Sequence, residues 1–102
     1  LTEGNAEVNK PANDGCTPLF IAAQEGEREV VKLLLTEGNA EVDKAMNDGC
    51  TPLYIAAQNG KTEAVKALLR GGADANIACQ GWTPLMIAKH RGHQAIVALL
   101  EQ

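Results

Sequence analysis

The residues of this chain that could do chemistry are three cysteines and two histidines. The cysteines Cys16, Cys50 and Cys79 are odd in number and lack paired spacing, which predicts no disulfide framework and favours a reducing, intracellular and cytoplasmic setting. His90 and His93 flank a glycine near the C-terminal end. Nucleophilic catalysis needs a nucleophile, a base and an orienting group within reach, and no carboxylate is obviously placed to orient either histidine. We therefore predict that the protein is not an enzyme.

Charge and hydropathy exclude two further classes of function. The 102 residues carry a net charge of −4, which gives no general attraction to nucleic-acid phosphates or anionic membranes. The longest apolar stretch, at 30–35, is interrupted by Lys32 and is far shorter than the ~20 residues of a membrane span. Glu29 and Lys32, like Glu63 and Lys66, lie three apart and should form weak surface pairs. We expect neither a nucleic-acid partner nor a membrane.

The elements that position these residues belong to a repeat. Residues 14–19, DGCTPL, return as residues 48–53, a shift of 34 positions. Laying residues 1–34 over residues 35–68 gives 25 identities. A third and more diverged copy, GWTPL, stands at 81–85, 32 positions after the second. A fixed period of this length indicates a solenoid in which each unit packs on its neighbours.

Each copy carries signals for the start and end of a helix. Thr17 precedes Pro18, and a Thr hydroxyl can cap free backbone N–H groups while Pro suits the first helical position. Gly26 permits the positive φ that ends a helix. A second helix follows, and residues 39–48, rich in Asn, Asp and Gly, read as an extended turn or hairpin.

Six short helices are predicted on these signals. In the second helix we expect Val30, Val31, Leu34 and Leu35 to face inward. Helices of this length are marginal alone, so they need neighbours for their apolar faces. The expected spans are about 18–25, 28–35, 52–59, 62–70, 84–91 and 94–101.

This pattern resembles the ankyrin repeat, whose signature is T-P-L-H-x-A at a period of roughly 33 residues. Residues 17–23 and their copies at 51–57 and 83–88 are similar to that signature, and residues 72–76 are similar to the opening of the family's hairpin. The resemblance covers the whole chain. It implies an all-α fold, an ankyrin-repeat solenoid of stacked antiparallel helix pairs joined by β-hairpin-like loops.

Some positions depart from the family pattern. The family's His after Thr-Pro-Leu is replaced by Phe20, Tyr54 and Met86. In the family that His helps to tie the hairpin backbone together, so we expect apolar packing, helped by the Tyr54 hydroxyl, to take its place. Asn5 and Asn39 are each similar to a one-residue insertion, which explains the 34-residue period.

The chain reads as one ankyrin repeat domain, 1–102, with unlike ends. Lys89 replaces the alanine found at Ala23 and Ala57, which suits a polar C-terminal cap. Leu1 aligns with Leu35, so we expect either an excerpt from a longer array or an N-terminal face that pairs with another chain. The expected divisions are a remnant hairpin at 1–13, repeats at 14–47 and 48–80, and a capping repeat at 81–102.

Metal and phosphate sites are not predicted, and no cofactor is expected. Zinc sites use close pairs of Cys and His. Cys16 and Cys50 hold equivalent positions in adjacent repeats, whose helical layers lie roughly 8–10 Å apart, so they should neither bridge nor share a metal. Gly71 and Gly72 end a helix rather than opening one, which excludes a phosphate loop there.

The resemblance implies that a protein partner binds the hairpin tips and the inner surface of the first helices. Trp82 is the best candidate anchor because Trp is enriched at interface hot spots; alternatively it covers the side of its own hairpin. Met46, at another tip, carries the same two alternatives. Carried over position by position, the expected surface comprises Pro11, Asn13, Asp14, Cys16, Gln24 and Glu25; Ala45, Asn47, Asp48, Cys50, Gln58 and Asn59; and Gln80, Trp82, His90 and Arg91.

Two hypotheses for function follow. The first is a non-catalytic protein–protein interaction module with a partner of unknown identity. The second is an engineered or excerpted scaffold with no dedicated partner, self-associating through its N-terminal face. The second rests on the near-identity of the first two copies, because a surface tuned to one asymmetric partner should differ between repeats.

Overall fold

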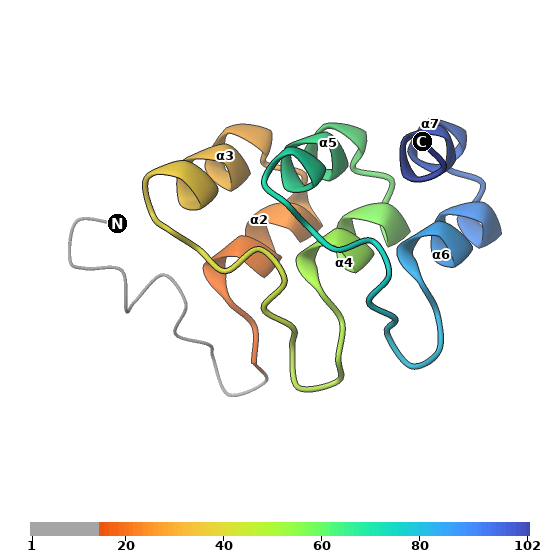
Figure 1. The fold of residues 1–102 in the computed structure, drawn as a ribbon, viewed down its shortest axis with the longest axis horizontal. Coiled ribbons are helices and arrows are strands. Elements are labelled where there is room, and N and C mark those ends of the chain that lie inside the picture. Colours follow the sequence, from red (N-terminus) through yellow and green to blue (C-terminus); the bar gives the residue numbers. More distant parts are fainter. Residues whose placement is uncertain (1–14) are drawn as a thin grey trace.

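A computed structural model of the chain describes residues 15–102, which form six helices packed in two rows (Figure 1). The remnant hairpin and Pro11, Asn13 and Asp14 lie outside the described residues. The arrangement confirms the predicted all-α fold. The inner row comprises α2 (Pro18–Glu25), α4 (Pro52–Gln58) and α6 (Pro84–Arg91), and the outer row comprises α3 (Arg28–Thr36), α5 (Thr62–Arg70) and α7 (Gln94–Leu100).

Each inner helix begins at the Thr-Pro pair that the sequence marks. Thr17 Oγ1 accepts a hydrogen bond from the backbone N–H of Phe20 at 3.2 Å, and the same bond recurs from Thr51 and Thr83. Proline fills the first turn of all three helices. Gly26 ends α2 with a φ of +75°, and its N–H donates to carbonyls of the last turn. The predicted starts and stops are therefore confirmed to within one residue.

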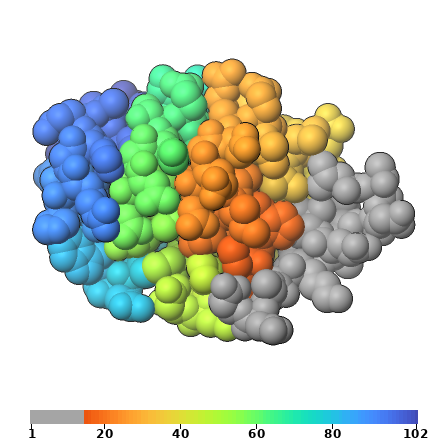
Figure 2. Space-filling model, turned by 180° about the vertical axis from the view of Figure 1, so that it is seen from behind, coloured from red at the N-terminus to blue at the C-terminus, as the bar shows by residue number. Residues whose placement is uncertain are grey.

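The core lies between the two rows and between successive repeats. Small side chains such as Ala23, Ala57 and Ala88 are fully buried and let the inner helices approach closely. Leu53 and Leu68 of the middle repeat are fully buried as well. Figure 2 shows the result as three adjoining bands, one for each repeat. Each repeat thus supplies the apolar partner that its neighbour needs.

One part of the predicted core is wrong. Val31 and Leu34 are buried, and Leu35 packs against the core, but Val30 is 43% exposed. Among residues 15–102, α3 has an outer-row neighbour on its α5 side alone, and Val30 faces away from that neighbour. Its counterpart Ala64 is buried because α5 has α3 beside it.

The loops hold the repeats together without strands. Within residues 15–102 the nearest approach to a strand pair is an isolated bridge between Cys79 and Trp82. The carboxylate of Asp43 in one loop accepts the backbone N–H of Asp74 in the next at 3.1 Å. Asn39, the predicted insertion, takes a φ of +54°, a left-handed conformation that Asn tolerates better than most residues.

The surface charges pair differently from one of the predictions. Glu63 and Lys66 form the expected pair at 3.3 Å. Glu29 instead binds its neighbour Arg28 at 2.9 Å, so the predicted pair with Lys32 is wrong. Arg28 reaches Glu29 with a planar guanidinium that matches a carboxylate, which a lysine ammonium cannot do. No helix among the described residues is both long and apolar enough to span a membrane.

Candidate partner-binding surface

Two adjoining hollows lie along the inner helices and the hairpin loops. The larger has a volume of about 610 Å³, the smaller one of about 490 Å³, and Gln24 and Gln58 line both. We call the two together the inner groove. They bring together many of the residues predicted for partner binding, and those that line the groove are Cys16, Gln24, Glu25, Asp48, Cys50, Gln58, Asn59, Gln80, Trp82 and Arg91.

Other predicted residues lie elsewhere. Ala45 and Asn47 stand on the second hairpin outside both hollows, and His90 lies behind Trp82. The groove also has walls that the prediction missed, since large side chains of the inner helices and the loops contribute to it. These are Phe20, Tyr54, Ile55, Lys61, Cys79 and His93, and Met46, which the sequence offered as a contact, lines the groove beside them. Phe20 and Tyr54 hold equivalent positions in the repeat, so the alignment of the repeats could have placed them on one face of the stack.

Trp82 covers its own hairpin, one of the two predicted alternatives, and keeps part of its side chain exposed. Its backbone pairs with Cys79 through two hydrogen bonds of 2.7 and 3.0 Å, so it closes its own hairpin. Its ring meets the His90 ring edge-on, with centroids 5.3 Å apart. The side chain is nevertheless 38% exposed and lines the larger hollow. A rigidly held aromatic ring with one open face needs little ordering on binding.

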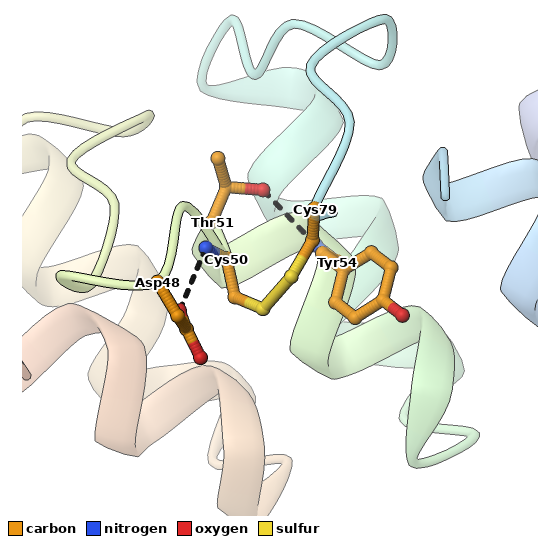
Figure 3. Close-up of a disulfide and its surroundings, with 5 residues drawn as sticks. All are labelled: Asp48, Cys50, Thr51, Tyr54 and Cys79. Carbon is orange, nitrogen blue, oxygen red and sulfur yellow. Dashed lines mark hydrogen bonds between the residues drawn. A yellow bond between two sulfur atoms is a disulfide. The ribbon is translucent and has the colours of Figure 1, made fainter. Parts of the chain in front are cut away.

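The prediction that no cysteines pair is wrong. Cys50 and Cys79 form a disulfide between the second and third hairpins, with Cα atoms 4.7 Å apart (Figure 3). Cys16 does not bridge to Cys50, as expected. Comparing equivalent positions of adjacent repeats missed the bond because Cys79 is not equivalent to Cys50. It stands three residues before that position, on the arm of the next hairpin that lies beside Cys50.

The disulfide bears on the expected cellular setting and on the question of a metal site. The cysteine argument for a reducing, cytoplasmic setting loses its premise, because a stable disulfide is favoured in oxidising compartments. Asp48, Cys50 and Cys79 place their ligand atoms within 4.8 Å of one another. The bonded sulfurs offer no thiolate to a metal in this state. Asp48 is instead occupied locally, accepting the Cys50 backbone N–H at 3.0 Å.

Comparison with known families agrees with the geometry. A family model described as ankyrin repeats (3 copies) matches residues 39–102, and one described as an ankyrin repeat matches residues 14–47. The chain belongs to the ankyrin repeat family. A search of curated proteins finds no match. Ankyrin repeats are in general protein–protein interaction modules and are typically non-catalytic.

The residues that replace the family's signature His are buried in two repeats of this ankyrin domain and exposed in the third. Phe20 and Tyr54 are buried, so apolar packing takes the place of the His in two repeats, as predicted. Met86 is 45% exposed, so the prediction is wrong for the third repeat. The Tyr54 hydroxyl makes no hydrogen bond within residues 15–102. Tyr54 therefore contributes through its ring, which lines the inner groove.

Polar bonds cross from one ankyrin repeat to the next along the inner groove. Asn59 Nδ2 donates to the Gln24 carbonyl at 3.3 Å, and His93 Nε2 donates to the Gln58 carbonyl at 3.0 Å. His93 thus has a structural role, since it links the second repeat to the third. These bonds join the inner helices of adjacent repeats along the groove.

Proposed function

We propose that this ankyrin domain is a non-catalytic module that binds a partner protein in the inner groove and at the hairpin tips. The observation that carries the proposal is the continuity of the groove across all three repeats, with the half-open Trp82 ring at one end. Tryptophan is enriched among the few residues that carry most of the binding energy of a protein interface.

The lining favours an extended peptide segment as the bound element. Gln24, Gln58 and Gln80 present side-chain amides along the groove, and an amide can both donate to and accept from a peptide backbone. Trp82 and Tyr54 add apolar surface between them. A groove lined by side-chain amides and aromatic rings suits a bound peptide of ordinary composition better than a highly charged peptide.

The test is a selection of peptides on this domain, followed by affinity measurements on variants. Peptides from a random display library are selected against the disulfide-bonded domain and their Kd values are measured by fluorescence anisotropy. We expect Trp82→Ala to weaken binding by roughly 30-fold, the loss that a hot-spot residue of about 2 kcal/mol gives. Gln58→Ala and Asn59→Ala should weaken it less.

The matched control is Glu29→Ala, an exposed residue of the outer row. It should leave every Kd unchanged. If the selected peptides bind all three groove variants as tightly as the parent, the inner groove is not the binding surface.

A second candidate function is self-association, and one observation favours it. Ile21, Val30 and Leu33 are exposed apolar side chains on the side of the first repeat that faces away from the second. We call this the N-terminal face. A second copy of the chain could bury it, and sedimentation at rising concentration should then reveal a dimer that Val30→Glu dissolves. A monomer at every concentration contradicts this candidate, while Trp82→Ala serves as a variant that should not affect it.

A further inference from the structure

Among the helices of the first two repeats, the outer pair differs more in sequence than the inner pair. The inner helices α2 and α4 differ over their shared length at one position, Phe20 against Tyr54. A surface that recognises one asymmetric partner must differ between repeats, and the outer helices meet that condition better than the inner helices do. Helices α3 and α5 differ at four of their nine positions, which are Arg28/Thr62, Val30/Ala64, Leu33/Ala67 and Thr36/Arg70.

These differences open a cleft between α3 and α5. Its volume is about 170 Å³, and we call it the outer cleft. Ala67 lines it where the preceding repeat has the larger Leu33. Leu35 and Gly71 complete an apolar floor, and a Cβ at Gly71 would lie 2.7 Å from the Leu35 side chain. A cavity of roughly 150 Å³ holds a benzene ring, so the outer cleft has room for one apolar side chain.

The rim of the outer cleft is basic in an acidic chain. Arg28, Lys32, Lys66 and Arg70 line it, four of the nine Lys and Arg residues in a chain of net charge −4. Among the repeats that residues 15–102 form, the junction of α3 and α5 has this rim and the junction of α5 and α7 does not. The position equivalent to Lys66 is Ala98 in α7, and the position equivalent to Arg70 is Gln102, which follows α7.

Part of this positive charge is left over after internal pairing. Glu63 binds Lys66 at 3.3 Å and Arg28 at 3.5 Å. The hydrogen bond and charge of Lys66 hold the pKa of the Glu63 carboxyl below its ordinary value, so this carboxylate stays ionised at neutral pH. Lys32 and Arg70 are exposed and have no ion pair within residues 15–102. One uncompensated cation therefore stands on each wall of the outer cleft.

We propose that the outer cleft binds an acidic segment of a partner protein. One apolar side chain of that segment sits over Ala67 and Leu35, and flanking Asp or Glu carboxylates pair with Lys32 and Arg70. The guanidinium of Arg70 matches a carboxylate with two parallel hydrogen bonds. The outer cleft and the inner groove lie on different rows of helices, so each proposal can fail without the other.

The probe is a fluorescein-labelled peptide of about twelve residues, built of Glu and Ala around one central Phe and long enough to form a nascent helix. Fluorescence anisotropy at low salt measures its Kd for the complete domain. Two reference peptides carry Gln in place of every Glu, or Ser in place of the Phe. We expect each reference peptide to bind at least about tenfold more weakly, since each loses one of the two kinds of contact.

Charge-reversal variants test the rim. The double variant Lys32→Glu, Arg70→Glu should raise the Kd of the probe peptide by at least about tenfold. Added salt should raise the Kd of the parent domain as well. The matched control is Lys44→Glu with Lys89→Glu, two exposed lysines that do not line the outer cleft and give the same change in net charge. Because Lys89 pairs with Glu101 at 3.4 Å, circular dichroism checks that the control variant is folded. Both variants are compared with the parent at about 0.15 M salt, where the Debye length is about 8 Å. The control should then weaken probe binding less than about twofold, because distant surface charges are screened.

Ala67→Leu tests the floor without changing the charge. It fills the outer cleft with the side chain that the first repeat carries at Leu33, and should remove the advantage of the Phe peptide over the Ser peptide. Circular dichroism checks that this variant is folded, and the rim variants, which alter exposed residues alone, stand as the test if it is not.

Three results would overturn the proposal. The first is that the Gln peptide binds as tightly as the Glu peptide. The second is an undiminished affinity in the rim variant. The third is binding of a general anion. Inorganic phosphate at the concentration of the probe peptide would displace it, or vesicles containing phosphatidylserine would bind through Lys32 and Arg70 when the peptide does not. In that case the cations form a general anion or membrane site rather than a protein-docking cleft.

Discussion

At the scale of single residues, the Thr-Pro pairs do the most for the fold. Thr51 is almost fully buried, and its hydroxyl oxygen accepts the N–H of Tyr54 at 3.2 Å. Without this bond, the backbone N–H at the start of the helix would be buried with no acceptor. The cap therefore starts α4 and fixes the direction of the preceding hairpin.

Thr51→Ala should lower the free energy of unfolding by about 1 kcal/mol, the usual cost of a lost N-cap. Thr51→Ser, which keeps the accepting oxygen, should recover most of the loss. Urea denaturation followed by circular dichroism measures both. Thr36→Ala is the control, since its exposed hydroxyl donates to a helix carbonyl and caps no helix start. Equal losses in Thr51→Ala and Thr36→Ala would contradict the capping role.

At the scale of elements, the sequence predicts helices well and loops poorly. Helix ends are encoded locally by Thr, Pro and Gly, whose effects act within one turn. The loops depend on contacts with the next repeat. Cys79 meets Cys50 across 29 positions, and Asp74 meets Asp43 across 31, so neither contact has a local signature.

The disulfide between the second and third hairpins should stabilise the domain. Cys79→Ser is expected to lower the free energy of unfolding by about 2–4 kcal/mol, because the unfolded chain is no longer constrained by the closed loop. Urea unfolding with and without dithiothreitol measures this. The reductant should destabilise the parent and leave Cys79→Ser unchanged.

Cys16→Ser is the matched control for the disulfide, since Cys16 takes no part in it. It should behave like the parent in both buffers. A parent domain whose unfolding midpoint is the same in oxidising and reducing buffer would contradict the stabilising role of the bond.

At the scale of the whole molecule, three repeats share one core, so a destabilising substitution in the second repeat should lower the stability of the first and third repeats too. Leu68→Ala removes a fully buried side chain of α5 and should cost about 2–5 kcal/mol. The chain has one tryptophan, Trp82 in the third repeat, whose fluorescence reports on that repeat alone. We expect the fluorescence and circular dichroism transitions to shift together, as cooperative unfolding requires.

The control for this experiment is Leu33→Ala, the counterpart of a position that is already alanine in α5. Leu33 is exposed, so its loss should have little effect. A Trp82 transition that stays in place in Leu68→Ala would show that the repeats unfold independently.

The candidate surfaces were predictable to different degrees. The inner groove was largely expected, because inner helices share one orientation and the equivalent positions Gln24 and Gln58 must fall in line. The groove walls at Phe20 and Tyr54 were missed, since their burial depends on how closely the helices approach. The outer cleft was not expected at all. It exists because Ala67 and Gly71 leave space against Leu35, a residue far from both in sequence.

The sequence by itself determined the repeat, the six helices and the all-α stack, because period, caps and apolar spacing are local or exactly repeated signals. The tertiary structure alone decided the Cys50–Cys79 bond, the exposure of Val30 and the basic rim of the outer cleft. Each of these depends on which side of a repeat has a neighbour and how near that neighbour comes. Aligning the repeats pairs equivalent residues, whereas the contacts between repeats join residues that are not equivalent, such as Cys50 and Cys79.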